Sequence, residues 1–284
     1  MSAPTSEKLP TYFIGHGGVS ILFKPGYEPV HQGLREMGKE IKALKPDAIL
    51  LTCGHFQSET DAIQVNLKEP TKVWHDLGPS WWTTFPHVFE YQYPHKSSKA
   101  LGEKVLKHLV DQGIKAEGVE RDLDHGIWVP FKLMFPEGED ELDVPILQIS
   151  TYDGNDFNAH IRLGEALSSL GDRILIIGSG MISHNLRATR EQSMDTTVAR
   201  LIEEAAFAAL AAPTTQERDA QFLALQQRDD WPLAHPTEEH VLPLYVTLGV
   251  GKDWQDYKVW NHDQYIVGQS YFSFRLGALP EVEP

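Results

Sequence analysis

Two histidines follow short apolar segments that are typical of buried strands. Segment Thr11–Ile14 runs into GHGG, which contains His16, and segment Asp47–Cys53 runs into a Gly-His pair that ends at His55. In open α/β sheets, ligands bind beyond the carboxyl ends of the strands, and glycines there leave space in front of an imidazole ring. Either histidine alone would more often be a hydrogen-bonded structural residue. As a pair, we expect them to be metal ligands.

A third histidine, His184, follows the apolar segment Arg173–Ile177 after a turn of small residues, GSGMIS. A histidine presented in this way fits a base at the edge of a cleft. A glycine-rich turn can also bind phosphate, but neither a basic residue nor a long helix N-terminus supports that interpretation here.

Two further histidines lie in distinctive surroundings. His125 is preceded by Asp124, which could orient its imidazole, and is followed by Trp128, which could line an apolar cavity. His240 follows Thr237, a plausible N-cap, so we expect it on the first turn of a helix near one end of the sheet. The alternative for His240 is a solvated helix start without a ligand role.

These residues supply several imidazoles and no thiolate. Imidazole binds zinc, iron, copper and nickel, and catalytic sites keep positions for water or substrate. The spacings match neither H-E-x-x-H nor C-x-x-C, and the single cysteine, Cys53, fits a small core residue in an apolar strand. The residues alone therefore predict a histidine-rich metal enzyme.

The elements that must position these side chains alternate between strands and helices. This order predicts an α/β fold with a central mostly parallel or mixed sheet flanked by helices. The expected strands are Thr11–Ile14, Asp47–Cys53, Val144–Ser150 and Arg173–Ile177, and the expected helices are Val30–Leu44, Ser97–Gln112, Asn158–Leu170 and Thr196–Ala212.

No linker is visible, so we expect residues 1–284 to form one catalytic domain with a flexible N-terminus over residues 1–10. The segment Trp74–Pro94 is rich in aromatic residues and predicts a long loop that walls a pocket, with irregular core or a subunit contact as alternatives. Pro213–Pro232 predicts a surface helix, and Tyr271–Phe274 predicts part of a terminal β-hairpin.

The composition narrows the classes of partner. Acidic residues outnumber basic ones by 40 to 25, and the resulting net charge of −15 disfavours nucleic acid and anionic membranes. Without an apolar signal segment or a membrane-length apolar run, we expect a cytoplasmic monomer or small homo-oligomer. A substrate carboxylate would need a local cation, and Arg187 beside His184 is the best candidate. A surface or helix-capping arginine is the alternative there.

Five motifs in order along the chain resemble the class III extradiol ring-cleaving dioxygenases, and most closely the DOPA extradiol dioxygenase group. They contain His16, His55, His125, His184 and His240, and they read GHGG, strand-GH, DHG-x-W, SHNLR and PTEEH-x-LPLY. The segment Trp74–Asp76 and the pair Tyr93-Pro94 also resemble that pattern. The resemblance runs from about Tyr12 to Gly249.

The resemblance implies roles for these residues. His16, His55 and His240 would bind the metal, His184 would act as acid and base, and His125 would assist dioxygen or substrate. Many class III enzymes have a glutamate where His240 stands, and Glu239 is a weaker substitute. The resemblance thus implies Fe(II) for activity, with Zn(II) possible in the same three-histidine site.

The implied substrates are dioxygen and a small catechol, such as dopa, caffeate or protocatechuate. We expect Arg187, Trp128 and His75 to contact the catechol. Two other functions use the same residues: a zinc hydrolase that activates water, and a non-enzymatic binding protein resembling the Memo-like proteins. The full set of five histidines disfavours the second.

Overall fold

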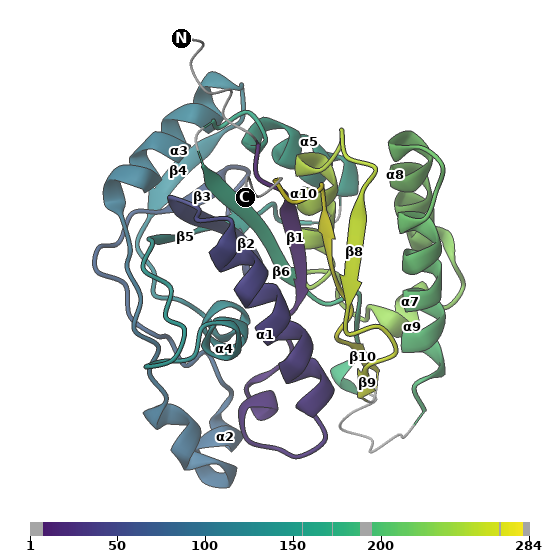
Figure 1. Ribbon diagram of the computed structural model, residues 1–284, viewed down its shortest axis with the longest axis horizontal. Helices are drawn as coiled ribbons and strands as arrows, with labels where there is room; N and C mark the ends of the chain where they lie inside the picture. Colours follow the sequence, from purple (N-terminus) through teal and green to yellow (C-terminus); the bar gives the residue numbers. More distant parts are fainter. Residues whose placement is uncertain (1–7, 155, 172, 188–194, 267, 281–284) are drawn as a thin grey trace.

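The computed structural model describes residues 8–154, 156–171, 173–187, 195–266 and 268–280. Across these ranges, eight strands form one sheet in the order β4-β3-β5-β2-β6-β1-β11-β8 (Figure 1). Their bounds are β1 Thr11–Gly15, β2 Ala48–Gln57, β3 Ile63–Asn66, β4 Ala116–Val119, β5 Ile146–Thr151, β6 Ile174–Gly180, β8 Tyr257–Trp260 and β11 Ser273–Leu276.

The sheet is mixed, as the α/β prediction allowed. Strands β5, β2, β6 and β1 are adjacent and parallel, and they correspond to the four apolar segments predicted as strands. The neighbouring β3 and β11 are antiparallel to this group. Strand β2 continues through His55 to Gln57 with a shift in register after Thr52, so it is longer than predicted.

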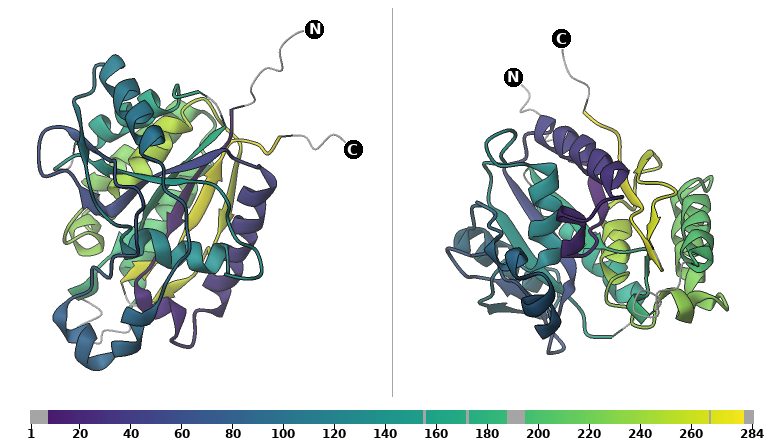
Figure 2. Two further views of the ribbon diagram at one scale, coloured as in Figure 1. Left: turned by 90° about the vertical axis from the view of Figure 1, so that its left-hand side faces the viewer. Right: turned by 90° about the horizontal axis from the view of Figure 1, so that it is seen from below.

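Helices cover both faces of the sheet (Figure 2). The longer ones are α1 Glu28–Ala43, α3 Lys99–Asp111, α4 His125–Met134, α5 Phe157–Leu167, α7 Thr197–Leu210, α8 Thr215–Ala224 and α10 Leu242–Val250. The four predicted helices correspond to α1, α3, α5 and α7. The sequence predicted only the start of α10, and at the wrong residues, and it did not predict α4, because both helices are apolar nearly all round and lack the one-sided pattern of a surface helix.

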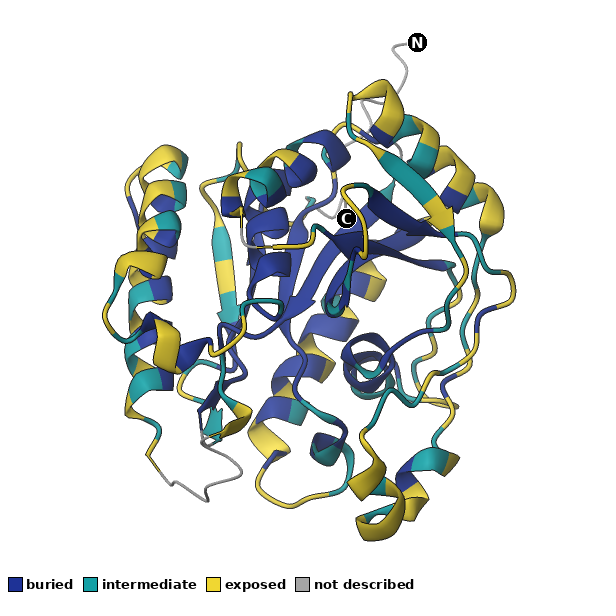
Figure 3. Ribbon diagram, turned by 180° about the vertical axis from the view of Figure 1, so that it is seen from behind, coloured by how far each residue is buried: buried dark blue, intermediate teal, exposed yellow. Residues whose placement is uncertain are grey.

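Side chains of the central strands alternate between two layers. In β1, Tyr12 and Ile14 belong to the core beneath α1 and α4, whereas Phe13 belongs to the core that contains α7 and α10. Burying one such side chain contributes about 1.5–3 kcal/mol. Figure 3 shows that the central strands are buried along most of their length. This burial on both faces explains their continuous apolar sequences.

The aromatic segment is more regular than predicted. It contains helix α2, Pro79–Thr84, and the 3₁₀ helix η2, Pro86–Glu90, so the expectation of a segment without regular elements was wrong. A proline stands at the start of each, where its fixed φ favours the first helical turn and its missing N–H costs no hydrogen bond. Helix α2 projects beyond α4 at the edge of the molecule (Figures 1 and 3).

The C-terminal strands complete the sheet. Strand β11 pairs antiparallel with both β1 and β8, so the predicted terminal strand belongs to the main sheet, although it begins at Ser273 and not at Tyr271. A second, small antiparallel sheet consists of β7 Ser183–His184, β10 Gln269–Ser270 and β9 Tyr265–Ile266. It lies beside the carboxyl end of β6, and therefore holds His184 near the other histidines.

Two further parts of the fold are the predicted surface segment and the N-terminus. Helix α8 and the short elements η3 Leu225–Gln227 and α9 Trp231–Ala234 occupy the predicted surface segment, although Arg218 and Phe222 of α8 are buried. The predicted flexible N-terminus lies partly outside the described residues, but Leu9 and Pro10 are buried. Among the described helices, none is long and apolar enough to cross a membrane.

Candidate metal centre and active site

Three histidines from distant parts of the chain meet at the carboxyl edge of the parallel strands. His16 follows β1, and His55 lies near the end of β2; the two parallel strands flank β6, so their carboxyl ends bring both histidines to one edge of the sheet. The third is His240. One ring nitrogen from each of the three lies within 4.8 Å of the others.

His240 reaches this edge through a loop that passes over two glycines. A Cβ atom on Gly54 would stand 2.9 Å from the Cα of His240, and one on Gly180 would stand 2.1 Å from its carbonyl oxygen. That carbonyl accepts a hydrogen bond of 2.8 Å from the backbone N–H of Met181. The predicted helix start was wrong, because α10 begins two residues later, at Leu242, and the Thr237 hydroxyl donates to Glu239.

Each of the three rings has a partner for its δ nitrogen. The Nδ1 of His240 donates to Oε1 of Glu239 at 2.9 Å, and the Nδ1 of His55 lies 3.5 Å from Oδ2 of Asp76. The Nδ1 of His16 lies 3.0 Å from the Ser179 hydroxyl, which uses its own hydrogen to donate to the Gly126 carbonyl. The δ nitrogens therefore carry the protons, and the ε nitrogens keep their lone pairs.

The ε nitrogens of His55 and His240 face each other at 3.2 Å. The lone pairs of two neutral imidazole rings repel each other at this distance, whereas a cation placed between them would be bound by both nitrogens. Nitrogen ligands 2.0–2.1 Å from one ion stand about 2.9–3.4 Å apart. The donor set and the spacing therefore fit a metal ion, and Glu239 acts as the hydrogen-bond partner of His240 instead of as a ligand.

Burial keeps these imidazoles neutral, as metal binding requires. Burial and the nearby histidines lower the pKa of His16 and of His240 well below the usual range. The pKa of His55 falls to about 4, first because of burial and then because of His125. The pKa of Asp76 is about 2: burial opposes ionisation, but hydrogen bonds and charge from His125 outweigh it.

Two more histidines border the same space. The ring of His184 stacks on His240 with centroids 3.5 Å apart, and burial followed by His240 lowers its pKa to about 2. His125 is the first residue of α4, and its ring lies 4.0 Å from that of His55. The sequence motifs thus identified five histidines that the fold does bring together.

The carboxylate beside His125 is not the one that the sequence suggested. Asp124 points away into the core, where it caps α4 through Gly126 and accepts hydrogen bonds from Cys53 and Arg121. Asp76 instead contacts the His125 ring, and sequence reasoning missed it as a site residue. Its only signal was the Trp-His-Asp segment. Cys53 is buried with a raised pKa, as expected of a core thiol.

The histidines line a cavity of about 660 Å³. Arg187 lies on its wall, in agreement with its predicted position, together with Gly18, Leu77, Trp81 and Gln269. Trp128 and His75 do not line this cavity. Trp128 is fully buried and donates from its indole to the Trp74 carbonyl, and His75 bonds the Tyr91 carbonyl. Trp128 thus ties the start of the aromatic segment to α4, and His75 makes a contact within that segment.

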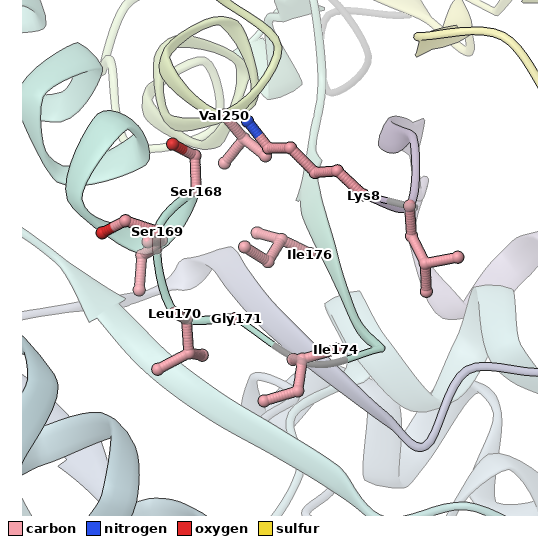
Figure 4. A pocket seen from close by; sticks show the side chains of 10 residues that line it. Lys8, Ser168, Ser169, Leu170, Gly171, Ile174, Ile176 and Val250 are labelled. Carbon is pink, nitrogen blue, oxygen red and sulfur yellow. The ribbon is translucent and has the colours of Figure 1, made fainter. Parts of the chain in front are cut away.

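A second cavity, of about 200 Å³, opens at the amino ends of β1 and β6 (Figure 4). Lys8, two serines at the end of α5 and aliphatic side chains such as Ile174 and Val250 line it. As far as the described residues define its wall, it has no histidine, cysteine or carboxylate. The chemistry is therefore at the opposite edge of the sheet.

The chain matches the family described as "Catalytic LigB subunit of aromatic ring-opening dioxygenase" over residues 13–275. It belongs to this family. A "4,5-DOPA dioxygenase extradiol" from Beta vulgaris is 31% identical over 244 residues, covering 84% of this chain and 85% of that protein. The protein of that name from Portulaca grandiflora is 29% identical over 260 residues, covering 89% and 91%.

A relative named "4,5-DOPA dioxygenase extradiol" from Escherichia coli K12 is 26% identical over 252 residues, covering 86% of each chain. A crystal structure of an uncharacterized protein from the same organism superimposes with a TM-score of 0.69 and 23% identity, covering 95% of this chain and all of that one. This likeness supports the fold. The family assignment agrees with the resemblance recognised from the five motifs.

Proposed function

We propose that this LigB-family protein is an extradiol dioxygenase that opens the ring of a small catechol with dioxygen. The observation that carries the proposal is the convergence of unprotonated ε nitrogens, with His55 and His240 facing each other at 3.2 Å and His16 beside them. In this proposal the three histidines hold Fe(II). Zn(II) would fit the same nitrogens, but only the iron supplies redox chemistry between ring and oxygen.

His184 is proposed as the proton acceptor for a catechol hydroxyl. It lines the cavity, stacks on His240 and is neutral, so its imidazole has a lone pair available. A pKa of about 2 makes it a weak base in the free protein. The negative charge of a bound catecholate would offset the burial penalty and raise that pKa, since an adjacent anion favours the imidazolium.

His125 is proposed to stabilise negative charge that develops on the reacting oxygen atoms, as an imidazolium that donates a hydrogen bond from its ε nitrogen. Its position at the first residue of α4 places the positive end of the helix dipole beside it. Its δ nitrogen donates to Asp76 at 2.9 Å, which holds the ring toward His55 and the cavity.

The cavity supports a single-ring substrate with a short side chain. Its volume lies within the range of about 300–1,000 Å³ found for small-molecule sites. Apolar side chains such as Val19, Leu77 and Trp81 would contact the ring, and Arg187 would pair with a carboxylate. That cation would offset the repulsion that a net charge of −15 exerts on an anionic substrate.

The test begins with metal-free protein reconstituted anaerobically with Fe(II). Dopa, caffeate, protocatechuate and catechol are then added in air, while oxygen uptake and the yellow semialdehyde are followed. We expect one equivalent of oxygen per catechol, with loss of turnover in His184→Ala despite a filled metal site. If iron-loaded protein consumes no oxygen with any catechol, the dioxygenase proposal is wrong. Ester or amide hydrolysis by the zinc form would then support the hydrolase alternative.

A further inference from the structure

We infer that Asp76 is a positioning residue that couples a proposed metal ligand, His55, to a proposed catalytic residue, His125. This inference rests on the proposed function for the roles of the two histidines. The coupling itself rests on contacts in the structure. Asp76 belongs to the segment between β3 and α2, and its side chain is only 9% exposed.

The two carboxylate oxygens of Asp76 have different partners. Oδ1 accepts from the backbone N–H of His125 at 3.0 Å and from its Nδ1 at 2.9 Å. Oδ2 lies 3.5 Å from Nδ1 of His55. Because the carboxylate is planar and rigid, rotation of one imidazole away from its oxygen would disturb the other. The ring centroids of His55 and His125 lie only 4.0 Å apart, so little free space absorbs such a movement.

No other carboxylate among the described residues contacts two of the five histidines within ion-pair distance. Glu239 pairs with His240, and its other hydrogen bond comes from Thr237. Asp124 faces Arg121, Gln148 and Cys53 in the core. The shared contact is therefore a property of Asp76 and not of acidic residues near the site in general.

The backbone two residues before Asp76 is fixed at both its N–H and its carbonyl group. The N–H of Trp74 donates to the Leu123 carbonyl at 2.7 Å, and the indole of Trp128 donates to the Trp74 carbonyl at 3.1 Å. Both partners flank the start of α4, which carries His125. The aromatic segment and the start of α4 are thus joined as one unit, and Asp76 connects that unit to β2 through His55.

The first test uses metal binding without any catechol. Asp76→Asn keeps the size of the side chain but removes its charge, and Glu239→Gln is the matched control at His240. Zn(II) affinity is measured by competition with a chromophoric chelator. Loss of a carboxylate behind a ligand histidine weakens metal affinity by about 10- to 100-fold, so we expect this loss in both variants. Unchanged affinity in Asp76→Asn would overturn the coupling to His55.

The second test isolates the contact with His125. In metal-free protein with ¹⁵N-labelled histidine, we expect the Nδ1–H signal of His125, assigned by its absence in His125→Ala, to disappear or shift upfield in Asp76→Ala. In Glu239→Gln it should stay in place. A signal unaffected by Asp76→Ala would overturn the coupling to His125. Circular dichroism of each metal-free variant checks that the fold is retained.

The third test uses turnover at saturating iron. If Asp76 acts on kcat through His125, Asp76→Asn should lower kcat in the otherwise wild-type protein. In the His125→Ala protein the same substitution should lower kcat by less than about twofold, because the effects of two residues that act as a unit on the activation free energy do not add. Glu239→Gln should lower kcat by the same factor in both backgrounds. Independent, multiplying effects of Asp76→Asn and His125→Ala would contradict the inference. If the wild type turns over no catechol, the proposed function fails while the first two tests still decide the coupling.

Discussion

The ε nitrogens of His55 and His240 lie 3.2 Å apart, although 185 positions separate the two residues in the chain. The δ nitrogen of each ring faces a carboxylate, an arrangement that favours a proton on Nδ1 and a lone pair on Nε2. In the metal-free protein this arrangement brings two lone pairs together, and a bound cation would relieve their repulsion. Metal binding should therefore stabilise the fold as well as supply chemistry.

We first predict that one equivalent of Zn(II) or Fe(II) raises the melting temperature. A ligand present at 100 times its dissociation constant stabilises the native state by about 2.7 kcal/mol. The gain should disappear with a chelator and in His16→Ala, His55→Ala and His240→Ala, as followed by thermal denaturation. The control is His87→Ala, an exposed histidine away from the cluster, which should retain the full gain. An equal loss in this control would argue against a single three-histidine site.

A second prediction concerns the size of the substrate. Gly18 lines the cavity, a Cβ there would meet no atom within 4 Å, and its backbone angles of −86° and 172° suit any residue. Gly18→Leu should fill cavity space without strain. We expect kcat/KM for dopa and caffeate to fall at least tenfold, with a much smaller change for catechol. Metal affinity should be unchanged. Equal losses of kcat/KM for large and small catechols would show that the substrate does not bind beside Gly18.

A third prediction concerns the substrate carboxylate. A hydrogen bond to a charged group contributes about 1.5–3 kcal/mol, so Arg187→Gln should lower kcat/KM for protocatechuate about 10- to 100-fold and leave catechol nearly unaffected. Steady-state kinetics with both substrates gives the ratio. Arg200→Gln is the control, because Arg200 is exposed on α7 and pairs with Glu204. A uniform loss for the acid and for catechol would exclude a carboxylate contact.

A fourth prediction concerns acid stability. His235 is 4% exposed, and among the described residues neither ring nitrogen has a hydrogen-bond partner of standard geometry, although the Ile182 backbone interacts with the ring. Burial, followed by the nearby His184, lowers its pKa to about 3, whereas an unfolded histidine titrates near 6.5. Below pH 6.5, His235 therefore binds a proton in the unfolded chain but not in the native state. Stability falls by up to about 1.4 kcal/mol per pH unit until pH 3.

Replacing His235 by leucine should remove this acid sensitivity. Between pH 7 and pH 4.5, the unfolding free energy of the metal-free wild type should fall by about 2–3 kcal/mol more than that of His235→Leu. Urea denaturation at the two pH values measures the difference. Parallel losses in the two proteins would show that His235 is not the group responsible.

Much of the fold follows from the sequence alone. The continuous apolar segments ending near His16, His55 and Ser179 could only be strands buried on both faces, and the one-sided helices between them implied parallel order. Because parallel strands place their carboxyl ends at one edge, the sequence also predicted that His16 and His55 could meet there. The five motifs added His125, His184 and His240.

Only the tertiary structure decided how the remaining groups act. The sequence placed Asp124 beside His125, but adjacent residues of a helix cap point apart, and Asp76 from a distant segment contacts the ring instead. The aromatic side chain of Trp128, close to His125 in the sequence, suggested a residue that lines the pocket. The packing of α4 instead points this side chain into the core. His240 needed close passage over Gly54 and Gly180 to reach the cluster. These contacts join elements that are far apart in the sequence. The distance between such elements is set by the packing of the whole sheet, so no local sequence pattern predicts the contacts.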